Sequence, residues 1–370
     1  MIGVLHAYSR TNSGDGLLVD LTLERLGRAG VAVDDVLLVA LDPESFPEVP
    51  RRAPMGVRGR GVSADLVPAA WRSAAVATSA VTHRPLGDLA RRLAECDALV
   101  AVGGGYLRAV DLVSSVGTAL NHLPQLVAAG HSGRPTLYLP QSIGPLRGPV
   151  GEAVRRGLRR IDAVCVRDRW SAAELAGLPG LHQLPDLAVL DLAERFDGLE
   201  RARPGGAVGF VARQVPHADG YEAVVRRVAD GFGADAVWAV QTEGDRTKSD
   251  AVHYERLGIS AAGALADMLA ARRLSVVVSV RLHGALMALR AGVPAVHLAY
   301  DRKGPAAFAD LGLDEWCFDV RALSAPALAE AVRSLAADPG PYWDKVAGRI
   351  GELRAASARL DELVRATVSG

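Results

Sequence analysis

The segment SVRLHG at residues 279–284 carries the most suggestive chemistry in the sequence. Arg281 and His283 follow the apolar run SVVVSV, and in an extended backbone two side chains spaced by two positions lie on one face. A planar guanidinium suits a carboxylate or a phosphate, and an imidazole exchanges protons near neutral pH. We expect Arg281, His283 and Lys303, which follows the next apolar run, to converge on one anion, with His283 serving in proton transfer.

A second strand-end arginine, Arg167, follows the apolar residues 163–166. We expect its guanidinium to point into a cleft and to act as a catalytic contact for an anion. Asp168 either holds that guanidinium or caps the helix that Ser171 opens, and an ordinary ion pair at a helix start is the structural alternative. Asp186 has two similar interpretations, a residue facing the cleft or a cap on a turn.

Three loops at predicted strand ends carry small or amide-bearing residues. The motif NSGD at 12–15 allows a tight turn before a helix, where Asp15 either caps the helix or contacts substrate. The glycines at 103–105 permit close backbone approach but lack the G-x-G-x-x-G spacing of a dinucleotide site. The loop LPQSIGP at 139–145 follows a strand, where ligands bind in open α/β sheets. The expected substrate contacts are Asn12, Asp15, Gly104, Gly105, Gln141, Ser142, Asp168, Tyr300 and Lys303.

The remaining histidines and the cysteines predict no further site. His297 lies inside an apolar run and is expected in the core, and the other histidines show no pattern of partners. Neither His-x-x-x-His nor a histidine among paired carboxylates occurs, so no metal is expected. Three cysteines are far apart in the chain and are expected to be buried, reduced thiols.

The composition indicates a well-packed α/β enzyme. Hydrophobic residues make up 49% and charged residues 23%, and the 42 basic and 42 acidic residues cancel. A nucleic-acid-binding protein usually has a basic excess, so that class is disfavoured. We expect neither a signal peptide nor a membrane-spanning segment, and therefore a cytoplasmic protein that meets any membrane-linked substrate from that side.

Short apolar runs alternate with amphipathic stretches, which predicts strand–helix units on parallel sheets. Strands are expected at 2–7, 36–40, 98–102, 136–139, 163–166, 207–211, 236–240, 275–280 and 295–298. Helices are expected at 16–29, 87–94, 151–160, 221–232, 262–272, 284–291 and 343–368. The polar stretch ERARPGG at 200–206 suits a linker between two Rossmann-like lobes with a cleft between them.

The segment 43–85 is rich in proline and then in alanine, and contains arginines at 51, 52, 58 and 60. It fits a solvated loop, and it also fits a flap over the cleft. Its arginines would suit a diphosphate on an acceptor if the second interpretation holds.

Taken in order, N-S-G-D, G-G-G, Q-S-I-G-P, V-R-D-R-x-S, P-D, R-L-H-G and Y-x-x-K-G resemble the polysaccharide pyruvyl transferase family. The resemblance extends from about residue 3 to 312. It implies an α/β fold of two Rossmann-like lobes, glycosyltransferase-B-like, with an interlobe cleft. We expect an N-terminal lobe at 1–199 on the acceptor side, contributing Arg167, a C-terminal lobe at 207–340 with the phosphoenolpyruvate site, and a C-terminal helix at 341–370.

The resemblance also implies a function. Family members move a pyruvyl group from phosphoenolpyruvate to a sugar, usually as a cyclic ketal. It implies that Arg167, Arg281, His283 and Lys303 contact phosphoenolpyruvate or transfer protons. No cofactor is expected beyond this co-substrate, and the expected partner is a sugar or lipid-linked glycan, with peripheral contact to a membrane-linked substrate. The alternatives are a sugar-nucleotide-dependent glycosyltransferase of the same fold and a non-catalytic polysaccharide-assembly protein.

Overall fold

The computed structural model describes residues 1–55, 87–215, 218, 220–243 and 249–370. The chain forms two compact units. The first unit comprises residues 1–10, 15–187 and 358–370, and the second comprises 11–14 and 188–357. The main division therefore falls between Leu187 and Ala188, earlier than the expected linker at 200–206, and the short loop Thr11–Gly14 belongs with the second unit.

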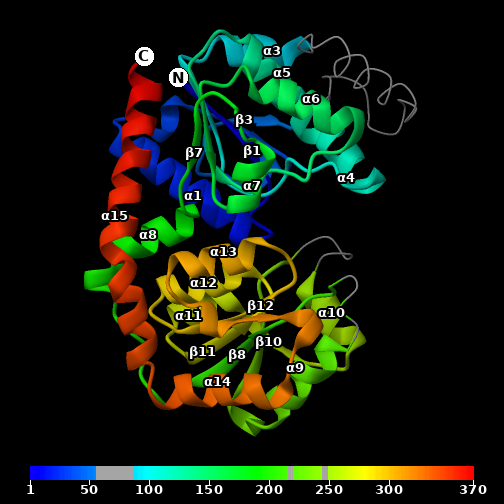
Figure 1. The fold of residues 1–370 in the computed structure, drawn as a ribbon, viewed down its shortest axis with the longest axis vertical. Coiled ribbons are helices and arrows are strands. Elements are labelled where there is room, and N and C mark those ends of the chain that lie inside the picture. Colours follow the sequence, from blue (N-terminus) through cyan, green and yellow to red (C-terminus); the bar gives the residue numbers. More distant parts are fainter. Residues whose placement is uncertain (56–86, 216–217, 219, 244–248) are drawn as a thin grey trace. The chain divides into compact units, whose positions relative to one another are not determined.

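The first unit is built on a seven-stranded parallel sheet in the order β3-β2-β1-β4-β5-β6-β7. Figure 1 labels β1, β3 and β7 of this sheet. Its interior strands are fully buried and mostly apolar, as expected of a parallel sheet with helices on both faces. The order reverses between β1 and β4, so the ligand crevice of such a sheet is expected at the carboxyl ends of these two strands. The strands are β1 (Ile2–Ala7), β2 (Val36–Ala40), β3 (Arg51–Pro54), β4 (Ala98–Ala101), β5 (Thr136–Gln141), β6 (Ala163–Val166) and β7 (Leu181–Gln183).

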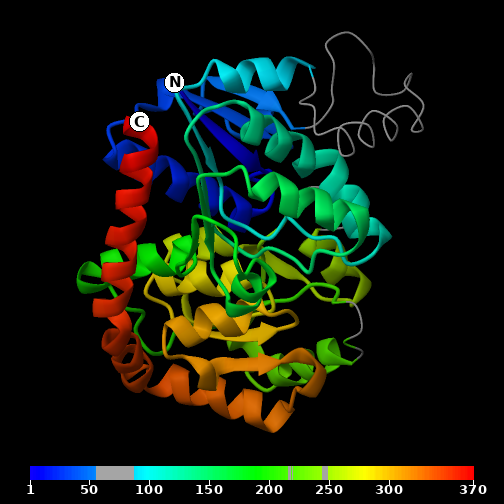
Figure 2. The same cartoon turned by 45° about the horizontal axis from the view of Figure 1, so that its top comes forward.

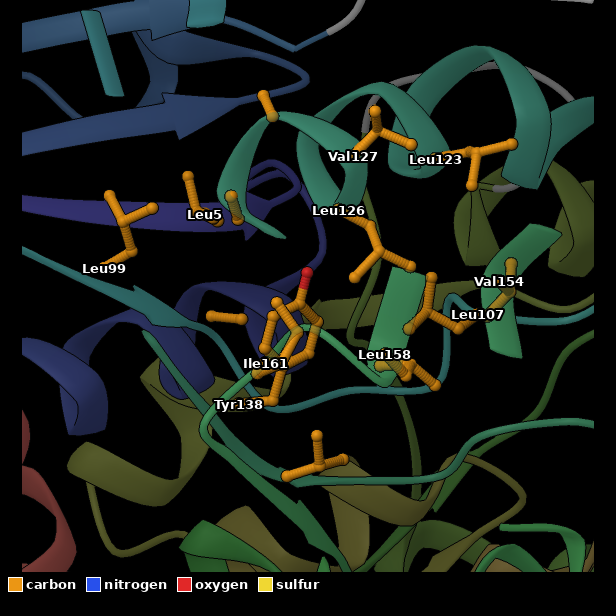
Figure 3. Packing of buried hydrophobic residues seen from close by; sticks show 14 of the residues in the cluster. Leu5, Leu99, Leu107, Leu123, Leu126, Val127, Tyr138, Val154, Leu158 and Ile161 are labelled. Carbon is orange, nitrogen blue, oxygen red and sulfur yellow. The ribbon is translucent and has the colours of Figure 1, made fainter. Parts of the chain in front are cut away.

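Helices of the first unit cover this sheet and enclose an apolar core. Figure 3 shows part of that core, in which Tyr138 of β5 lies among leucines and valines from the surrounding strands and helices. The helices are α1 (Ser13–Arg28), α3 (Gly87–Ala94), α4 (Leu112–Gly117), α5 (Leu123–His131), α6 (Gly148–Leu158) and α7 (Arg169–Glu174), with a π-helical turn at Thr118–His122.

The second unit repeats the same plan with six parallel strands in the order β10-β9-β8-β11-β12-β13. Its order reverses between β8 and β11, which places its expected crevice at their carboxyl ends. The strands are β8 (Ala207–Val211), β9 (Ala236–Val240), β10 (Ala261–Ala264), β11 (Leu274–Ser279), β12 (Ala295–Ala299) and β13 (Cys317–Asp319). The helices are α8 (Leu187–Arg195), α9 (Tyr221–Asp230), α10 (Asp250–Arg256), α11 (Leu265–Ala270), α12 (Leu282–Arg290), α13 (Lys303–Asp310) and α14 (Ala325–Ala337).

The C-terminal helix α15 (Gly340–Ser369) is a single 30-residue element, coloured orange-red to red in Figure 2. Its first part belongs to the second unit, where Tyr342 is buried and its hydroxyl donates to the Ala295 carbonyl at 2.9 Å. Its last part belongs to the first unit, where the Asp361 carboxylate accepts from Arg25 Nη1 at 2.5 Å. The helix expected at 343–368 is thus present and slightly longer.

Within the segment 43–85 the structure describes residues 43–55, and these form neither a solvated loop throughout nor a flap. Residues 43–45 form a 3₁₀ turn and residues 51–54 form β3, the edge strand that pairs with β2. Arg52 donates to the carbonyls of Phe46 and Val49 at 3.0 and 3.1 Å, so it closes its own loop. Arg58 and Arg60 lie outside the described residues.

Candidate functional site

The turn after β11 positions the arginine and histidine of SVRLHG. The Ser279 hydroxyl accepts from the Arg281 amide at 3.1 Å and donates to the Arg281 carbonyl at 2.7 Å, which bends the chain out of the strand. α12 then begins at Leu282. The expectation that Arg281 and His283 share one face of an extended strand is therefore wrong. Arg281 is the residue before the helix, and His283 lies in its first turn.

Arg281 is held by a buried carboxylate that the sequence did not reveal. Its Nε lies 3.0 Å from Asp250 Oδ1 and its Nη2 lies 2.6 Å from the same oxygen. Both side chains are almost completely buried. Asp250 also accepts from the amides of Gln241 and Thr242 at 3.0 Å each. The guanidinium is thus fixed in direction, and its charge is balanced by the Asp250 carboxylate.

Two glycines allow the NSGD loop to pack against His283 and Gln241 within the second unit. A Cβ on Gly14 would lie 2.6 Å from His283 Cβ, and a Cβ on Gly284 would overlap Gln241 Oε1. Asn12 pairs with Thr242 in an isolated antiparallel bridge, and its Oδ1 accepts from the Gly14 amide at 3.2 Å. The structure therefore brings Asn12 to the same place as His283.

Gln241, which the sequence analysis missed, is a candidate ligand contact. Its side chain is 6% exposed, and its Oε1 has no hydrogen-bond partner among the described residues. A buried carbonyl oxygen without a partner is costly, so a ligand donor or a water at this position would be favoured.

His297 connects the β11 turn with the start of α13. It is buried, and its Nδ1 lies 2.8 Å from the Ser279 carbonyl, which confirms the expected core placement. The pKa of His297 is lowered to about 4, chiefly by burial; the hydrogen bond with the Ser279 carbonyl and the charge of Asp301 oppose this effect, and His283 adds a smaller lowering contribution. His283 and the turn at Asp301 therefore both lie within electrostatic reach of His297.

Lys303 begins α13, and its ammonium lies 3.5 Å from the Asp301 carboxylate. Tyr300 is partly buried, with the Arg213 guanidinium 5.8 Å from its ring centroid. Tyr300 also lines a cavity of about 380 Å³ at the carboxyl ends of β12 and β13, together with residues that include Arg302 and Cys317. Burial, with Asp314 and Asp319 nearby, raises the pKa of the Cys317 thiol to about 12, so this thiol stays protonated.

Arg167 in the first unit repeats the arrangement of Arg281. Its Nη1 pairs with the buried Asp186 carboxylate, and its Nε donates to Ser142 Oγ at 3.0 Å. The aspartate that pairs with Arg167 here is thus Asp186 and not Asp168. Asp168 caps the amino end of α7, because its carboxylate accepts from the Ser171 amide at 2.8 Å.

The triple-glycine turn and the QSIGP loop are neighbours in the first unit. The Ser142 amide donates to the Gly104 carbonyl at 2.8 Å, and Gly104 bridges to the fully buried Gln141. Gly105 is partly exposed. Asp15 lies in the first turn of α1, where a carboxylate interacts favourably with the helix dipole.

Two histidines that sequence reasoning left without partners form a buried cluster in the first unit. His6 and His122 face each other, with Tyr8 and Tyr138 at the two ends. The partners lie more than 110 positions apart in the chain, so no local spacing could have revealed them. The sequence shows no pattern of partners for these histidines, and the fold supplies their partners from distant positions.

The part of the chain that the structure describes contains no group of three or more His, Cys, Asp or Glu residues suited to a metal. Within that part, no helix combines the length and the apolar character needed to cross a bilayer.

Comparison with known proteins identifies both a family and a fold. The sequence model described as polysaccharide pyruvyl transferase matches residues 12–302, which include Arg167, Arg281 and His283. No curated protein is significantly similar to the chain in sequence.

Among solved structures, sucrose-phosphate synthase from Thermosynechococcus elongatus is similar with a TM-score of 0.57 and 16% identity, covering 98% of each chain. UDP-N-acetylglucosamine 2-epimerase from Rickettsia bellii has a TM-score of 0.57 and 12% identity, covering 100% of this chain and 97% of its own. The expected α/β fold of two Rossmann-like lobes, of the glycosyltransferase-B type, is confirmed.

Proposed function

Because this chain belongs to the polysaccharide pyruvyl transferase family, we propose that it transfers the pyruvyl group of phosphoenolpyruvate to two hydroxyls of a sugar. The product is a cyclic ketal, and phosphate is released. The observation that carries the proposal is the family match across 12–302 together with the fixed arginine and helix-start histidine at the switch point of the second unit.

The proposed reaction balances as follows. A proton adds to the methylene carbon of phosphoenolpyruvate, and a sugar hydroxyl oxygen bonds to C2 while losing its proton. The C2–O bond to phosphate breaks, and a second hydroxyl oxygen bonds to C2. Of the two hydroxyl protons, one replaces the proton added to the methylene carbon and the other ends on phosphate. No oxidant, reductant or further cofactor is needed.

His283 is the residue to which we assign proton transfer, to the methylene carbon or to the departing phosphate. It lies in the first turn of α12. The backbone amides at the amino end of a helix can donate to an anion, and the helix dipole favours negative charge there. Arg281 gives a rigid guanidinium because Asp250 grips two of its nitrogens. Such pre-organisation lowers the cost of orienting a carboxylate or phosphate.

The net positive charge for phosphoenolpyruvate in the second unit must come from more than Arg281, since the Asp250 carboxylate balances its guanidinium. We assign this role to Lys303 and to the amino ends of α12 and α13. Gln241 Oε1, buried without a partner in the described chain, is available to accept from the substrate. Arg167 and Ser142 would contact substrate at the edge of the first unit's sheet.

The acceptor in this proposal is a sugar, free or as part of a lipid-linked glycan. The test is phosphate release from phosphoenolpyruvate by the full chain, measured with and without each member of a panel of glycosides and lipid-linked sugars. Release that requires an acceptor, with a pyruvate-derived mass increase on that acceptor, is the expected result. Phosphoenolpyruvate should also raise the thermal midpoint, because it binds the folded state.

The competing assignment is a sugar-nucleotide-dependent glycosyltransferase of the same fold. If UDP- or GDP-sugars raise the thermal midpoint, phosphoenolpyruvate does not, and no acceptor promotes phosphate release, the pyruvyl proposal is rejected. A chain that responds to neither class of donor would instead match a non-catalytic assembly protein.

A further inference from the structure

Four side chains form one hydrogen-bonded chain at the switch point of the first unit. Tyr8 Oη lies 2.7 Å from His122 Nε2, and His122 Nδ1 lies 3.2 Å from His6 Nδ1. His6 Nε2 in turn lies 2.9 Å from Tyr138 Oη. Tyr8 directly follows β1 and is half-buried, whereas the other three side chains are buried. This series of hydrogen-bonded side chains therefore extends from the core to the edge of the sheet where ligands bind.

Two irregularities of the backbone create this contact. His6 has a φ of 64°, in the left-handed region that a non-glycine residue rarely adopts, and its amide donates to Gln125 Oε1 at 2.9 Å. His122 ends the π-helical turn at Thr118–His122, a conformation that is rare and often found at functional sites. Strain of this kind persists only where the surrounding structure enforces it.

Both imidazoles are neutral. Burial lowers the pKa of His122 to about 3, and burial followed by the neighbouring His122 holds the pKa of His6 well below its usual value. The Tyr106 ring covers both, with centroid distances of 4.6 Å to His6 and 4.7 Å to His122. Each ring therefore carries a single N–H, and of the two facing Nδ1 atoms one donates and the other accepts.

The buried end decides the direction of the hydrogen bonds. Among the residues that the structure describes, the Tyr138 hydroxyl has a single hydrogen-bond partner, His6 Nε2. A buried O–H without an acceptor is costly, so Tyr138 donates to His6 Nε2. The His6 proton then sits on Nδ1 and is donated to His122 Nδ1. The His122 proton sits on Nε2 and is donated to Tyr8 Oη.

This direction has a consequence for Tyr8. Its oxygen accepts from His122, so its own O–H must point away from the buried chain. Burial, and to a lesser degree the charge of Asp15, raises the pKa of Tyr8, so this hydroxyl remains a protonated donor.

We propose that Tyr8 binds the acceptor substrate by donating its O–H to a sugar oxygen. Tyr138, His6 and His122 are positioning residues that fix the direction of this donor. The identity of the ligand rests on the proposed function, whereas the direction of the hydrogen-bonded chain rests on the contacts alone.

The direction is tested on the full-length protein by long-range ¹H–¹⁵N NMR spectra of the imidazoles, which distinguish protonated from bare ring nitrogens. His6 should be protonated at Nδ1 and bare at Nε2, and His122 should show the reverse. The opposite pattern, or an imidazolium on either residue, overturns the inferred direction. This measurement needs no activity, so it stands even if pyruvyl transfer is not found.

The binding role is tested with Tyr8→Phe, which keeps the ring and removes the donor. One neutral hydrogen bond corresponds to a rise of about 2- to 10-fold in the KM for the acceptor, with the KM for phosphoenolpyruvate unchanged. Tyr342→Phe is the matched control, since that hydroxyl donates to the Ala295 carbonyl at the start of β12. An unchanged acceptor KM in Tyr8→Phe overturns the role of Tyr8. If the wild-type chain transfers no pyruvyl group, the acceptor role fails together with the proposed function.

The positioning role is tested with Tyr138→Phe, which leaves the ring in the core and removes the group that sets the direction. The tautomers of His6 and His122 should become mixed or reversed, and the acceptor KM should rise while the phosphoenolpyruvate KM stays constant. A purely structural role would reduce the fraction of active protein, and so kcat, without moving either KM. Unchanged tautomers in this variant would overturn the positioning role.

Discussion

Asp250 accepts from both Nε and Nη2 of Arg281, so a carboxylate of the protein itself holds the guanidinium that follows β11. Asp186 holds Arg167 after β6 in the first unit. The two sheets thus contain the same kind of ion pair. In each, a buried aspartate fixes the direction of the strand-end guanidinium without any ligand, but it also neutralises the positive charge of that guanidinium.

The first prediction concerns the buried pair. Asp250→Asn should lower the free energy of unfolding by about 3–5 kcal/mol, because it leaves the Arg281 charge buried without its counter-ion. Urea unfolding followed by circular dichroism measures this change. Asp319→Asn is the control, since the Asp319–Arg321 pair is more than half exposed on the aspartate side. It should change stability by less than about 1 kcal/mol. Equal effects of the two substitutions would contradict the inferred role of Asp250.

The second prediction concerns His283. His283→Ala should lower kcat for pyruvyl transfer by about 10²–10⁴-fold, the usual effect of removing a catalytic acid or base. Stopped assays of phosphate release measure it, with thermal unfolding to confirm that the variant is folded. His131→Ala is the control, because that histidine is exposed on α5. Near-wild-type kcat in His283→Ala would remove this residue from the chemistry.

The third prediction concerns pH and stability. The pKa of His297 is lowered from 6.5 to about 4 in the folded protein. Between these values the unfolded chain binds a proton on this imidazole and the folded chain does not. The stability that His297 contributes is therefore complete above the unfolded pKa and is lost as the pH falls toward the folded pKa, by about 3 kcal/mol in all.

Urea midpoints at neutral pH and at mildly acidic pH test this sign. His297→Gln should lose part of the pH dependence, since glutamine does not titrate, whereas His131→Gln should retain it. His6 and His122 in the first unit also have lowered pKa values, so some acid sensitivity remains in each variant. A pH dependence that is identical in wild type and His297→Gln would refute the assignment.

The fourth prediction concerns close packing around Gln241. Gly284→Ala should destabilise the protein by about 1–3 kcal/mol, because the added methyl overlaps Gln241 Oε1 and also approaches Ser279 Oγ to 2.7 Å. Gly27→Ala is the matched control within a helix. Nothing lies within 4 Å of a Cβ at Gly27, so that change should stabilise α1 by about 0.5–1 kcal/mol. Calorimetric midpoints of the two variants should move in opposite directions.

The interior strands were predictable because they are buried apolar runs, whereas the short edge strands were not. β3 has the sequence RRAP and β7 the sequence LHQ, and both carry polar residues that exclude neither loop nor strand. β10 and β13 at the edges of the second sheet are equally short. Edge strands are often short and carry charged side chains, because both features discourage pairing with a strand of another molecule.

The candidate site was predictable only in its local parts. R-L-H-G and Y-x-x-K mark strand ends that the structure confirms as the starts of α12 and α13. Asp250 and Asp186 were not recognised as the partners of the arginines, because they lie 31 and 19 positions away. The extended geometry assumed for Arg281 and His283 failed because Ser279 Oγ binds the Arg281 backbone and starts the helix early.

The contact between Gly304 and His297 has a consequence for how this protein could vary. A side chain at position 304 would occupy the space of the His297 imidazole. The two positions therefore constrain each other: related sequences with a larger residue at 304 should carry a smaller one at 297. In a library that randomises both sites, functional pairs should conserve their combined volume even when neither residue is retained.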